Sequence, residues 1–266
     1  MVSKWHPWLY ELSVAAHRTR RRVLDRRSRQ WACERPEIVT DALVAEAASP
    51  LMRPFDGVDL TLQHNKRRNL ELAIATLDGQ VLRPGETVSF WRCVGNPKAS
   101  RGFVPGLVLV HDRLRAGVGG GLCQLSNMLH WLALHTSLAV VERHHHGHDL
   151  FPDAGRLVPF GAGATVFYNY LDLRLHNPGP ETYRLRLWLT DQELRGEIRA
   201  DEPPRLMYQV VEEGHGFRRT PGGLVRENRL YRVACDRATG APAGRELVAH
   251  NVFPVLYRPG PEVTIA

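Results

Sequence analysis

The residues best suited to chemistry lie in the stretch Gly119-Gly120-Gly121-Leu122-Cys123-Gln124. Consecutive glycines allow backbone turns closed to other residues and a close approach to a ligand. Apolar residues then recur at helical spacing, so Cys123 falls in the first turn of a predicted helix, where exposed amides and the helix dipole lower a thiol pKa. The pattern predicts a nucleophilic Cys123, with the Gln124 amide and the glycine amides stabilising an oxyanion. The same pattern also fits a small buried cysteine on a packed helix.

Histidines gather between Glu142 and Asp149, where the sequence is Glu-Arg-His-His-His-Gly-His-Asp. On a strand, His144, His146 and His148 would share one face. Such a face suits one imidazole acting as general base for a cysteine, or three imidazoles ligating zinc. The third interpretation is a loop of exposed polar residues.

Asp172 is the predicted carboxylate that orients the base. It lies in an otherwise apolar and aromatic run, where an ionised group needs a partner. A cysteine, a histidine and this aspartate would then follow the logic of nucleophile, base and orienting group. The alternative is an aspartate at a strand edge that faces water.

The elements that must position these residues predict an α+β fold. Apolar spacing indicates helices over Asn65–Leu77 and from Leu122 to about His135. β-prone runs lie at Val88–Trp91, Leu107–Val110, Ser137–Glu142, Thr165–Leu175, Tyr183–Leu189 and Leu194–Arg199, and more follow in the last third. We therefore expect a helical N-terminal half packed on a mostly antiparallel β-sheet from the C-terminal half.

The chain is expected to divide into three parts. Residues 1–50 are predicted to be a basic, arginine-rich helical lead-in, residues 51–200 the core domain, and residues 201–266 a β-rich C-terminal extension. At 266 residues with 43% hydrophobic and 24% charged residues, the chain is long and apolar enough for a folded core.

The positive charge of the chain is concentrated near the N-terminus. The formal net charge is +7, and seven arginines lie between His17 and Arg29. Such a segment can bind an anionic membrane surface, whereas no nucleic-acid-binding motif accompanies it. No apolar run is long enough for a membrane span or a secretory signal, so a cytoplasmic location is expected. The four cysteines are too widely spaced for a structural zinc module.

Several of these segments together resemble the VanW family, which is named after an accessory protein of glycopeptide-resistance gene clusters. The matching segments are Lys66–Leu77, Pro84–Trp91, Gly119–Asn127, Arg143 with His146, Ala164-Thr165 and Asp172-Leu173. The resemblance maps the recurring cysteine, glutamine and histidine to Cys123, Gln124 and His146, which argues against the three-histidine metal site. Relatives often carry an aspartate where this chain has Gly163, so any role of that aspartate is absent.

The resemblance implies a role in cell-wall peptidoglycan metabolism or glycopeptide resistance. One hypothesis is a cysteine-dependent hydrolase or acyl transferase acting on a peptide-like or amino-sugar substrate, in which His146 is the base. The three glycines, Ser126 and Arg143 would then line the substrate site. The other hypothesis is a non-catalytic module that binds an anionic wall precursor or headgroup at the inner membrane face. Neither hypothesis requires a cofactor or a metal.

Overall fold

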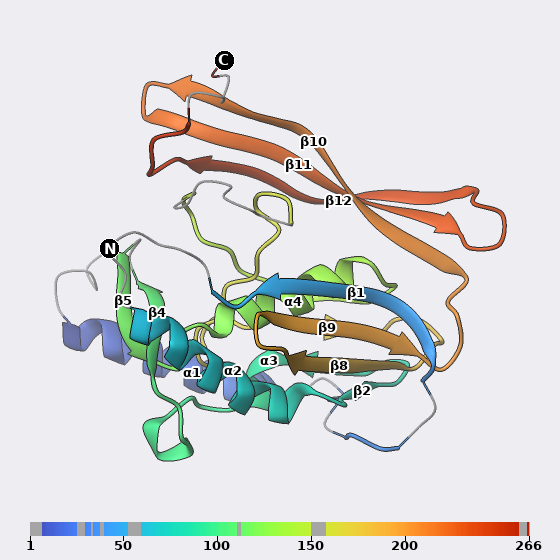
Figure 1. Cartoon of the computed structure of the whole chain (residues 1–266), viewed down its shortest axis with the longest axis horizontal. Coiled ribbons are helices and arrows are strands. Elements are labelled where there is room, and N and C mark those ends of the chain that lie inside the picture. Colours follow the sequence, from blue (N-terminus) through green and yellow to red (C-terminus); the bar gives the residue numbers. More distant parts are fainter. Residues whose placement is uncertain are drawn as a thin grey trace.

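The structure, a computed structural model, describes residues 7–25, 30–32, 34–37, 40–52, 60–110, 113–149, 158–260 and 265. Helices and antiparallel strands are mixed in it, so the α+β prediction is confirmed (Figure 1). The helices of this part of the chain are α1 (Pro7–Asp25), α2 (Leu60–Leu77), α3 (Phe90–Val94), α4 (Leu122–Leu134) and the short 3-10 helix η2 (Ala99–Arg101). The predicted helices at 65–77 and 122–135 correspond to α2 and α4.

The strands form four antiparallel groups. The largest holds β1 (Ala42–Pro50), β9 (Glu193–Ala200), β8 (Tyr183–Leu189) and β2 (Val81–Leu82), in that order. A second holds β3 (Thr87–Ser89), β7 (Arg174–His176) and β6 (Ala139–Glu142), and β4 (Pro105–Val110) pairs with β5 (Arg113–Val118). The last holds β10 (Leu206–Thr220), β11 (Gly223–Asp236) and β12 (Pro242–Pro254).

The N-terminal half is not purely helical. It contains the described helices, but it also supplies β1 to β5. Ala42 pairs with Ala200, so β1 forms an edge of the main sheet beside β9. The prediction of a helical lead-in over residues 1–50 therefore holds for α1 and is wrong for residues 42–50.

The predicted long strand Thr165–Leu175 is also wrong. Phe167 pairs with Leu171 across a tight turn, and regular pairing begins only at β7. Asn169 lies in this turn at a φ of 48°, a left-handed conformation that asparagine tolerates better than most residues. The aromatic residues that favour a strand in this run therefore form a turn.

The expected strand over Val88–Trp91 ends early because Phe90 begins α3. The side chain of Ser89 caps this helix by accepting a hydrogen bond from the backbone N–H of Arg92 at 3.2 Å. The strand part of the prediction is therefore limited to β3.

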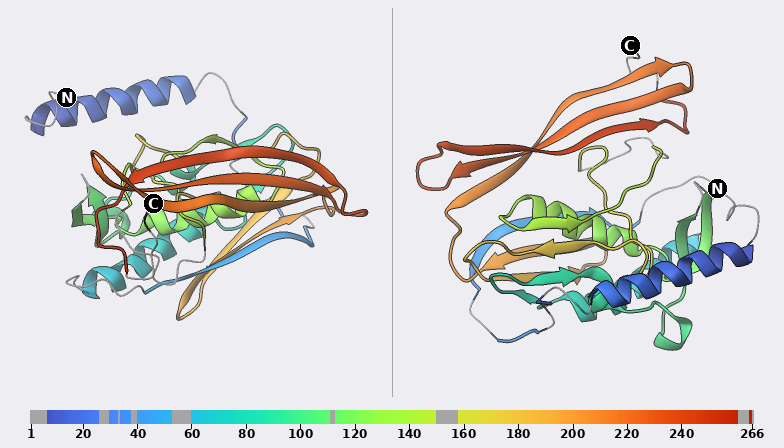
Figure 2. Two further views of the ribbon diagram at one scale, coloured as in Figure 1. Left: turned by 90° about the horizontal axis from the view of Figure 1, so that it is seen from above. Right: turned by 180° about the vertical axis from the view of Figure 1, so that it is seen from behind.

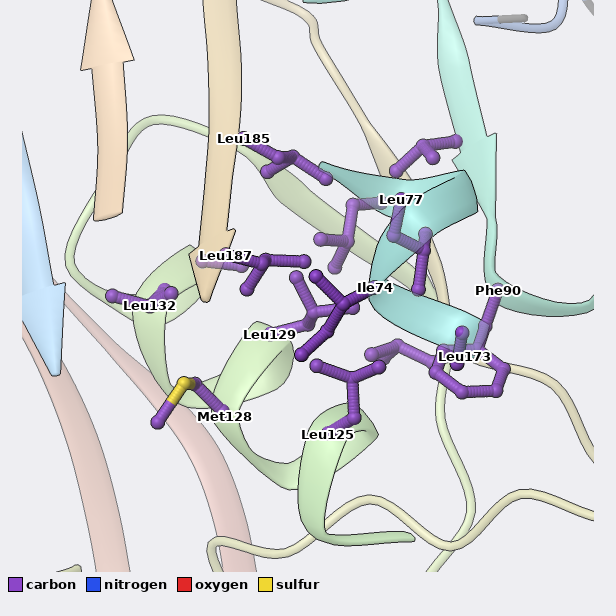
Figure 3. Close-up of a cluster of buried hydrophobic side chains, with 14 of the residues drawn as sticks. Ile74, Leu77, Phe90, Leu125, Met128, Leu129, Leu132, Leu173, Leu185 and Leu187 are labelled. Atoms are coloured by element: carbon purple, nitrogen blue, oxygen red, sulfur yellow. The ribbon is translucent and has the colours of Figure 1, made fainter. Parts of the chain in front are cut away.

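The hydrophobic core lies between α2, α4 and the main sheet (Figure 3). The labelled side chains converge from α2 (Ile74, Leu77), α4 (Leu125, Met128, Leu129, Leu132) and β8 (Leu185, Leu187), with Phe90 and Leu173 beside them. Each fully buried side chain of this kind contributes about 1.5–3 kcal/mol. Gly196 of β9 allows α4 to approach closely, because a Cβ there would lie 2.9 Å from the sulfur of Met128. The core fixes the position of α4, and with it that of Cys123.

The sheet β10-β11-β12 extends beyond α4 as a separate long layer (Figures 1 and 2). Its inner side packs on the segment that follows β6. Buried Arg226 is paired with Asp149 at 3.2 Å, and Asn228 donates to the carbonyl oxygen of Phe160 at 2.8 Å. Among the described residues, no helix is long and apolar enough to cross a membrane.

Candidate functional site

The three glycines form the turn between β5 and α4. Gly119 and Gly121 have φ angles of 78° and 94°, and at Gly120 the chain touches another backbone. A Cβ at Gly120 would lie 2.1 Å from the carbonyl carbon of Gly106, a distance no side chain can occupy. The turn therefore requires glycine for its own packing.

The amides of this turn are used within the protein. Gly119 donates to the carbonyl oxygen of Val104 at 3.1 Å, Gly120 to that of Gly117 at 3.0 Å, and Gly121 to that of Leu107 at 3.0 Å. Asn69 of α2 also donates to the carbonyl oxygen of Gly120 at 2.9 Å. The predicted oxyanion site does not form from these amides, because their hydrogens already bind carbonyl oxygens.

Cys123 is the second residue of α4, as predicted, and its side chain is half-buried. The thiol donates a hydrogen bond to the carbonyl oxygen of Val166, with a sulfur to oxygen distance of 3.7 Å. Burial raises the pKa of the Cys123 thiol above its ordinary value. The expected lowering of this pKa by the helix start is wrong, because desolvation outweighs it.

The polar side chains that follow Cys123 join α4 to its neighbours. Gln124 donates to the hydroxyl of Ser49 and to the carbonyl oxygen of Pro50, each at 2.9 Å. Ser126 is fully buried and donates to the carbonyl oxygen of Ala164 at 2.7 Å. The Gln124 amide therefore binds the end of β1. Its N–H group is used there and does not stabilise an oxyanion at Cys123.

Asp172 is buried and organises the start of α3. It accepts hydrogen bonds from the Ser89 hydroxyl at 2.6 Å and from the backbone N–H of Trp91 at 3.1 Å. Arg174 is its ionic partner, with Nε 2.9 Å from a carboxylate oxygen. The expected role of Asp172 in orienting His146 is therefore not supported, since these groups occupy both of its oxygens.

Around Asp172 lies an ionic cluster of five buried or half-buried side chains, Arg21, Asp25, Glu142, Asp172 and Arg174. Arg174 donates to both oxygens of Asp25 at 2.8 Å, and Arg21 donates to Glu142 at 2.7 Å. Burial raises the pKa of Glu142, but hydrogen bonds and charge from Arg21 outweigh it and lower that pKa overall. Sequence reasoning missed this cluster, because its members from α1 are more than one hundred residues away from the others.

The cluster changes the role of the arginine-rich segment. Arg18 and Arg21 bind groups of the protein itself: Arg18 donates to the carbonyl oxygen of Tyr168 at 3.2 Å. Arg20 is exposed, while Arg26, Arg27 and Arg29 lie outside the described residues. Part of the positive charge thus attaches α1 to the core, where the sequence predicted only a surface for docking.

The histidine segment does not form the alternative metal site. His144 contacts a carboxylate oxygen of Glu142 at 3.1 Å, and His145 stacks on Phe253 with 4.9 Å between ring centroids. Within the described part of the chain, no three His, Cys, Asp or Glu side chains come together as metal ligands would. His146 is half-buried, in an irregular stretch after β6.

One extended segment, Gly163–Val166, links the cysteine to the histidines. On one side it binds α4, through Ala164 with Ser126 and Val166 with Cys123. On its other side, the backbone N–H of Thr165 donates to the carbonyl oxygen of His144 at 2.7 Å. Cys123 and the histidine segment therefore border the same backbone, but the recorded hydrogen bond of the thiol goes to a carbonyl oxygen and not to an imidazole.

Arg143 lies where the histidine segment meets this backbone. Its Nε donates to the carbonyl oxygen of Gly163 at 2.9 Å, and its Nη2 donates to that of Gly161. Burial lowers the pKa of Arg143. Of the predicted substrate-binding residues, Arg143 alone carries a charge.

A family model described as VanW like protein matches residues 65–199, about half of the chain. The chain is also 32% identical over 220 residues to the Vancomycin B-type resistance protein VanW of Enterococcus faecalis (strain ATCC 700802 / V583), covering 83% of this chain and 80% of that protein. The chain belongs to the VanW family. A second similar protein, the Uncharacterized protein YoaR of Bacillus subtilis (strain 168), is 34% identical over 115 residues, or 42% of this chain and 36% of that protein.

The VanW model covers the elements from α2 to β9, and so includes the glycine turn, Cys123, Arg143 and Asp172. It lies inside the predicted core of residues 51–200. Strands β10 to β12 follow the region matched by the VanW model. No solved structure matches the chain.

Proposed function

We propose that this VanW-family chain acts in vancomycin resistance by binding an anionic precursor of the cell wall, without cysteine chemistry. The proposed role in resistance is supported by the 32% identity to the Enterococcus faecalis VanW over 83% of the chain. The region matched by the VanW model, residues 65–199, includes the core elements α4, β8 and most of β9.

The geometry around Cys123 favours binding over covalent catalysis. Its thiol is protonated at neutral pH because burial raises its pKa. The carboxylate of Asp172 is bound to Ser89 and Arg174, and the Gln124 amide is bound to β1. A cysteine hydrolase of the predicted kind would need the carboxylate to face the histidine base and the amide to face the reacting carbonyl group.

A second candidate is a hydrolase or acyl transferase with Cys123 as nucleophile and His146 as base. One observation favours it: the thiol and the histidine segment border the same extended stretch, through Val166 and Thr165. This candidate requires the His146 imidazole to accept the proton of the thiol, which in the structure donates to the carbonyl oxygen of Val166.

The proposed location is the cytoplasmic face of the membrane, where anionic lipids attract basic segments. The outer face of α1 supports this. Leu12 and Val23 are 60% and 46% exposed and lie eleven residues apart, which is three helical turns on one face. Arg20 is exposed on the same helix.

A growth assay separates the two candidates. An Enterococcus faecalis strain that lacks its VanW would express this chain, its Cys123→Ser variant or its Cys235→Ser variant, and vancomycin sensitivity would be measured. Cys235 is a matched control because it is another half-buried free cysteine, on β11. Binding without cysteine chemistry predicts that all three chains lower vancomycin sensitivity equally.

Loss of the effect with Cys123→Ser alone, at normal protein abundance, would favour the enzyme. No effect of the unaltered chain on vancomycin sensitivity would overturn the proposed role in resistance.

A further inference from the structure

The guanidinium of Arg143 is fixed by one edge and leaves the other edge for a ligand. Nε and Nη2 donate to the carbonyl oxygens of Gly163 and Gly161. These two bonds use two of the five N–H groups of an arginine. The remaining Nη1 and Nη2 hydrogens form a planar fork, the geometry that binds a carboxylate or phosphate through two parallel hydrogen bonds.

Arg143 is half-buried, and its partners differ from those of the buried arginines Arg174 and Arg226. Arg174 meets Asp25 at 2.8 Å, and Arg226 meets Asp149 at 3.2 Å. For Arg143, the hydrogen bonds go to backbone carbonyls, and no ion pair joins it to a carboxylate of the described residues. Even partial burial of a charge without an opposite charge is costly, so this half-buried position is suited to an anion from outside the protein.

The carboxylate next in sequence to Arg143 is engaged elsewhere. Glu142 accepts hydrogen bonds from Arg21 at 2.7 Å and lies 3.2 Å from Arg174. Consistent with this, desolvation alone shifts the pKa of Arg143, and it lowers that pKa. Glu142 therefore belongs to the ionic cluster and leaves the charge of Arg143 uncompensated.

The turn that holds Arg143 is itself fixed by α4. His130 is 1% exposed and its Nδ1 contacts the carbonyl oxygen of Ala162 at 2.8 Å, between the two glycines that hold Arg143. Burial, with a smaller effect of Arg143, lowers the pKa of His130 to about 3, so His130 is neutral at physiological pH. A guanidinium held in this way is ordered before a ligand arrives, which reduces the entropy lost on binding.

We propose that Arg143 is an oxyanion-binding residue and that its Nη1 and Nη2 edge binds a carboxylate or phosphate group. That this group belongs to a cell-wall precursor rests on the proposed function; the binding of an oxyanion does not. The oxyanion has two chemical sources. Amino-sugar acids supply a carboxylate, and lipid-linked or nucleotide-linked precursors supply a phosphate.

The test is a titration of the full chain with inorganic phosphate and, separately, with N-acetylmuramate, followed by calorimetry and by the NMR signal of the Arg143 side chain. The variants are Arg143→Gln and Arg143→Lys. Arg101→Gln is the matched control, because Arg101 also donates to two backbone carbonyls, of Val94 and Asn96 at 2.8 Å each, but is exposed.

We expect binding to weaken at least tenfold in Arg143→Gln, to weaken less in Arg143→Lys, which keeps the charge but loses the fork, and to stay unchanged in Arg101→Gln. Preference for phosphate or for N-acetylmuramate identifies the source. Equal affinity of the wild type and Arg143→Gln, or no movement of the Arg143 signal with either anion, would overturn the proposal. The NMR measurement on the wild type still tests oxyanion binding at Arg143 if Arg143→Gln does not fold.

The Arg143 site and the role in vancomycin resistance can be rejected independently of each other. Oxyanion binding at Arg143 in a chain without effect on vancomycin sensitivity would keep the site and reject the role. An effect on vancomycin sensitivity without oxyanion binding would do the opposite.

Discussion

Two regions of this protein carry the residue types of an active site, and they differ in how their polar groups are satisfied. Around Cys123 and Asp172, hydrogen bonds within the protein engage the glycine amides, the Gln124 amide and the Asp172 carboxylate. At Arg143, a half-buried cation is held by carbonyl oxygens. Residues that resemble catalytic groups can therefore serve the fold, whereas the incomplete charge pairing of Arg143 is the basis on which we propose a ligand there.

The largest loss of stability should follow removal of the Asp172 carboxylate, in the first region. Asp172→Ala leaves Arg174 without one of its buried partners and removes the acceptor of Ser89 and Trp91. We expect the free energy of unfolding, measured in urea, to fall by about 3–5 kcal/mol.

Asp191→Ala is the control for this change, because Asp191 is exposed in the turn between β8 and β9. It should change stability by less than about 0.5 kcal/mol. Near-normal stability of Asp172→Ala together with loss of vancomycin resistance would restore Asp172 as a functional group.

A substitution in the glycine turn should lower the free energy of unfolding almost as much. Gly120→Ala places a methyl group 2.1 Å from the carbonyl carbon of Gly106, so either the turn or β4 must move. A loss of about 3 kcal/mol is expected from thermal or urea unfolding. Gly147→Ala should leave stability nearly unchanged, because an added Cβ there meets no other group of the described residues within 4 Å. Similar effects of the two substitutions would contradict the packing role of the turn.

The second region should show a pH dependence that comes from His130. The pKa of His130 is about 3 in the folded protein, below its unfolded value near 6.5. The unfolded chain therefore binds a proton first, so stability is complete above pH 6.5 and falls as the pH decreases toward 3.

Between pH 7 and pH 5 the loss from this residue is about 2 kcal/mol. Unfolding of the wild type and of His130→Gln at these two pH values measures it. The loss should be smaller in His130→Gln by that amount, and identical pH profiles would contradict the buried, neutral imidazole.

The smallest effect should be on the reactivity of Cys123. Because burial raises its pKa, iodoacetamide should label it slowly at neutral pH, and at the same rate in wild type and His146→Ala. Mass spectrometry of the labelled peptides separates Cys123 from Cys93 and Cys235, which are also free thiols. Fast labelling at pH 7 that depends on His146 would support an activated thiolate and weaken the contrast between the two regions.

The sequence predicts the elements whose residues repeat with one clear period. Helices α2 and α4 and strands β8 and β9 lie close to where apolar spacing places them. The strand expected at Thr165–Leu175 fails because its aromatic residues pack around a turn, where Tyr168 lies against Trp91 with 5.6 Å between ring centroids. Strand propensity reflects such packing as much as the backbone itself.

The candidate site shows the same limit. The position of Cys123 at the start of α4 follows from local sequence, and so does the need for glycine before it. The ionic environment of Asp172 does not follow from local sequence, because its partner Arg174 is also paired with Asp25, a residue of α1. Long-range ion pairs depend on the tertiary fold, which residue spacing along one chain does not encode.

We propose that this VanW-family chain works through an oxyanion at Arg143 and not through the thiol of Cys123. The most direct measurement compares vancomycin sensitivity of cells that express Arg143→Gln or Cys123→Ser at equal abundance. We expect Arg143→Gln to abolish the effect of the chain and Cys123→Ser to preserve it. Preservation with Arg143→Gln and loss with Cys123→Ser would contradict the claim.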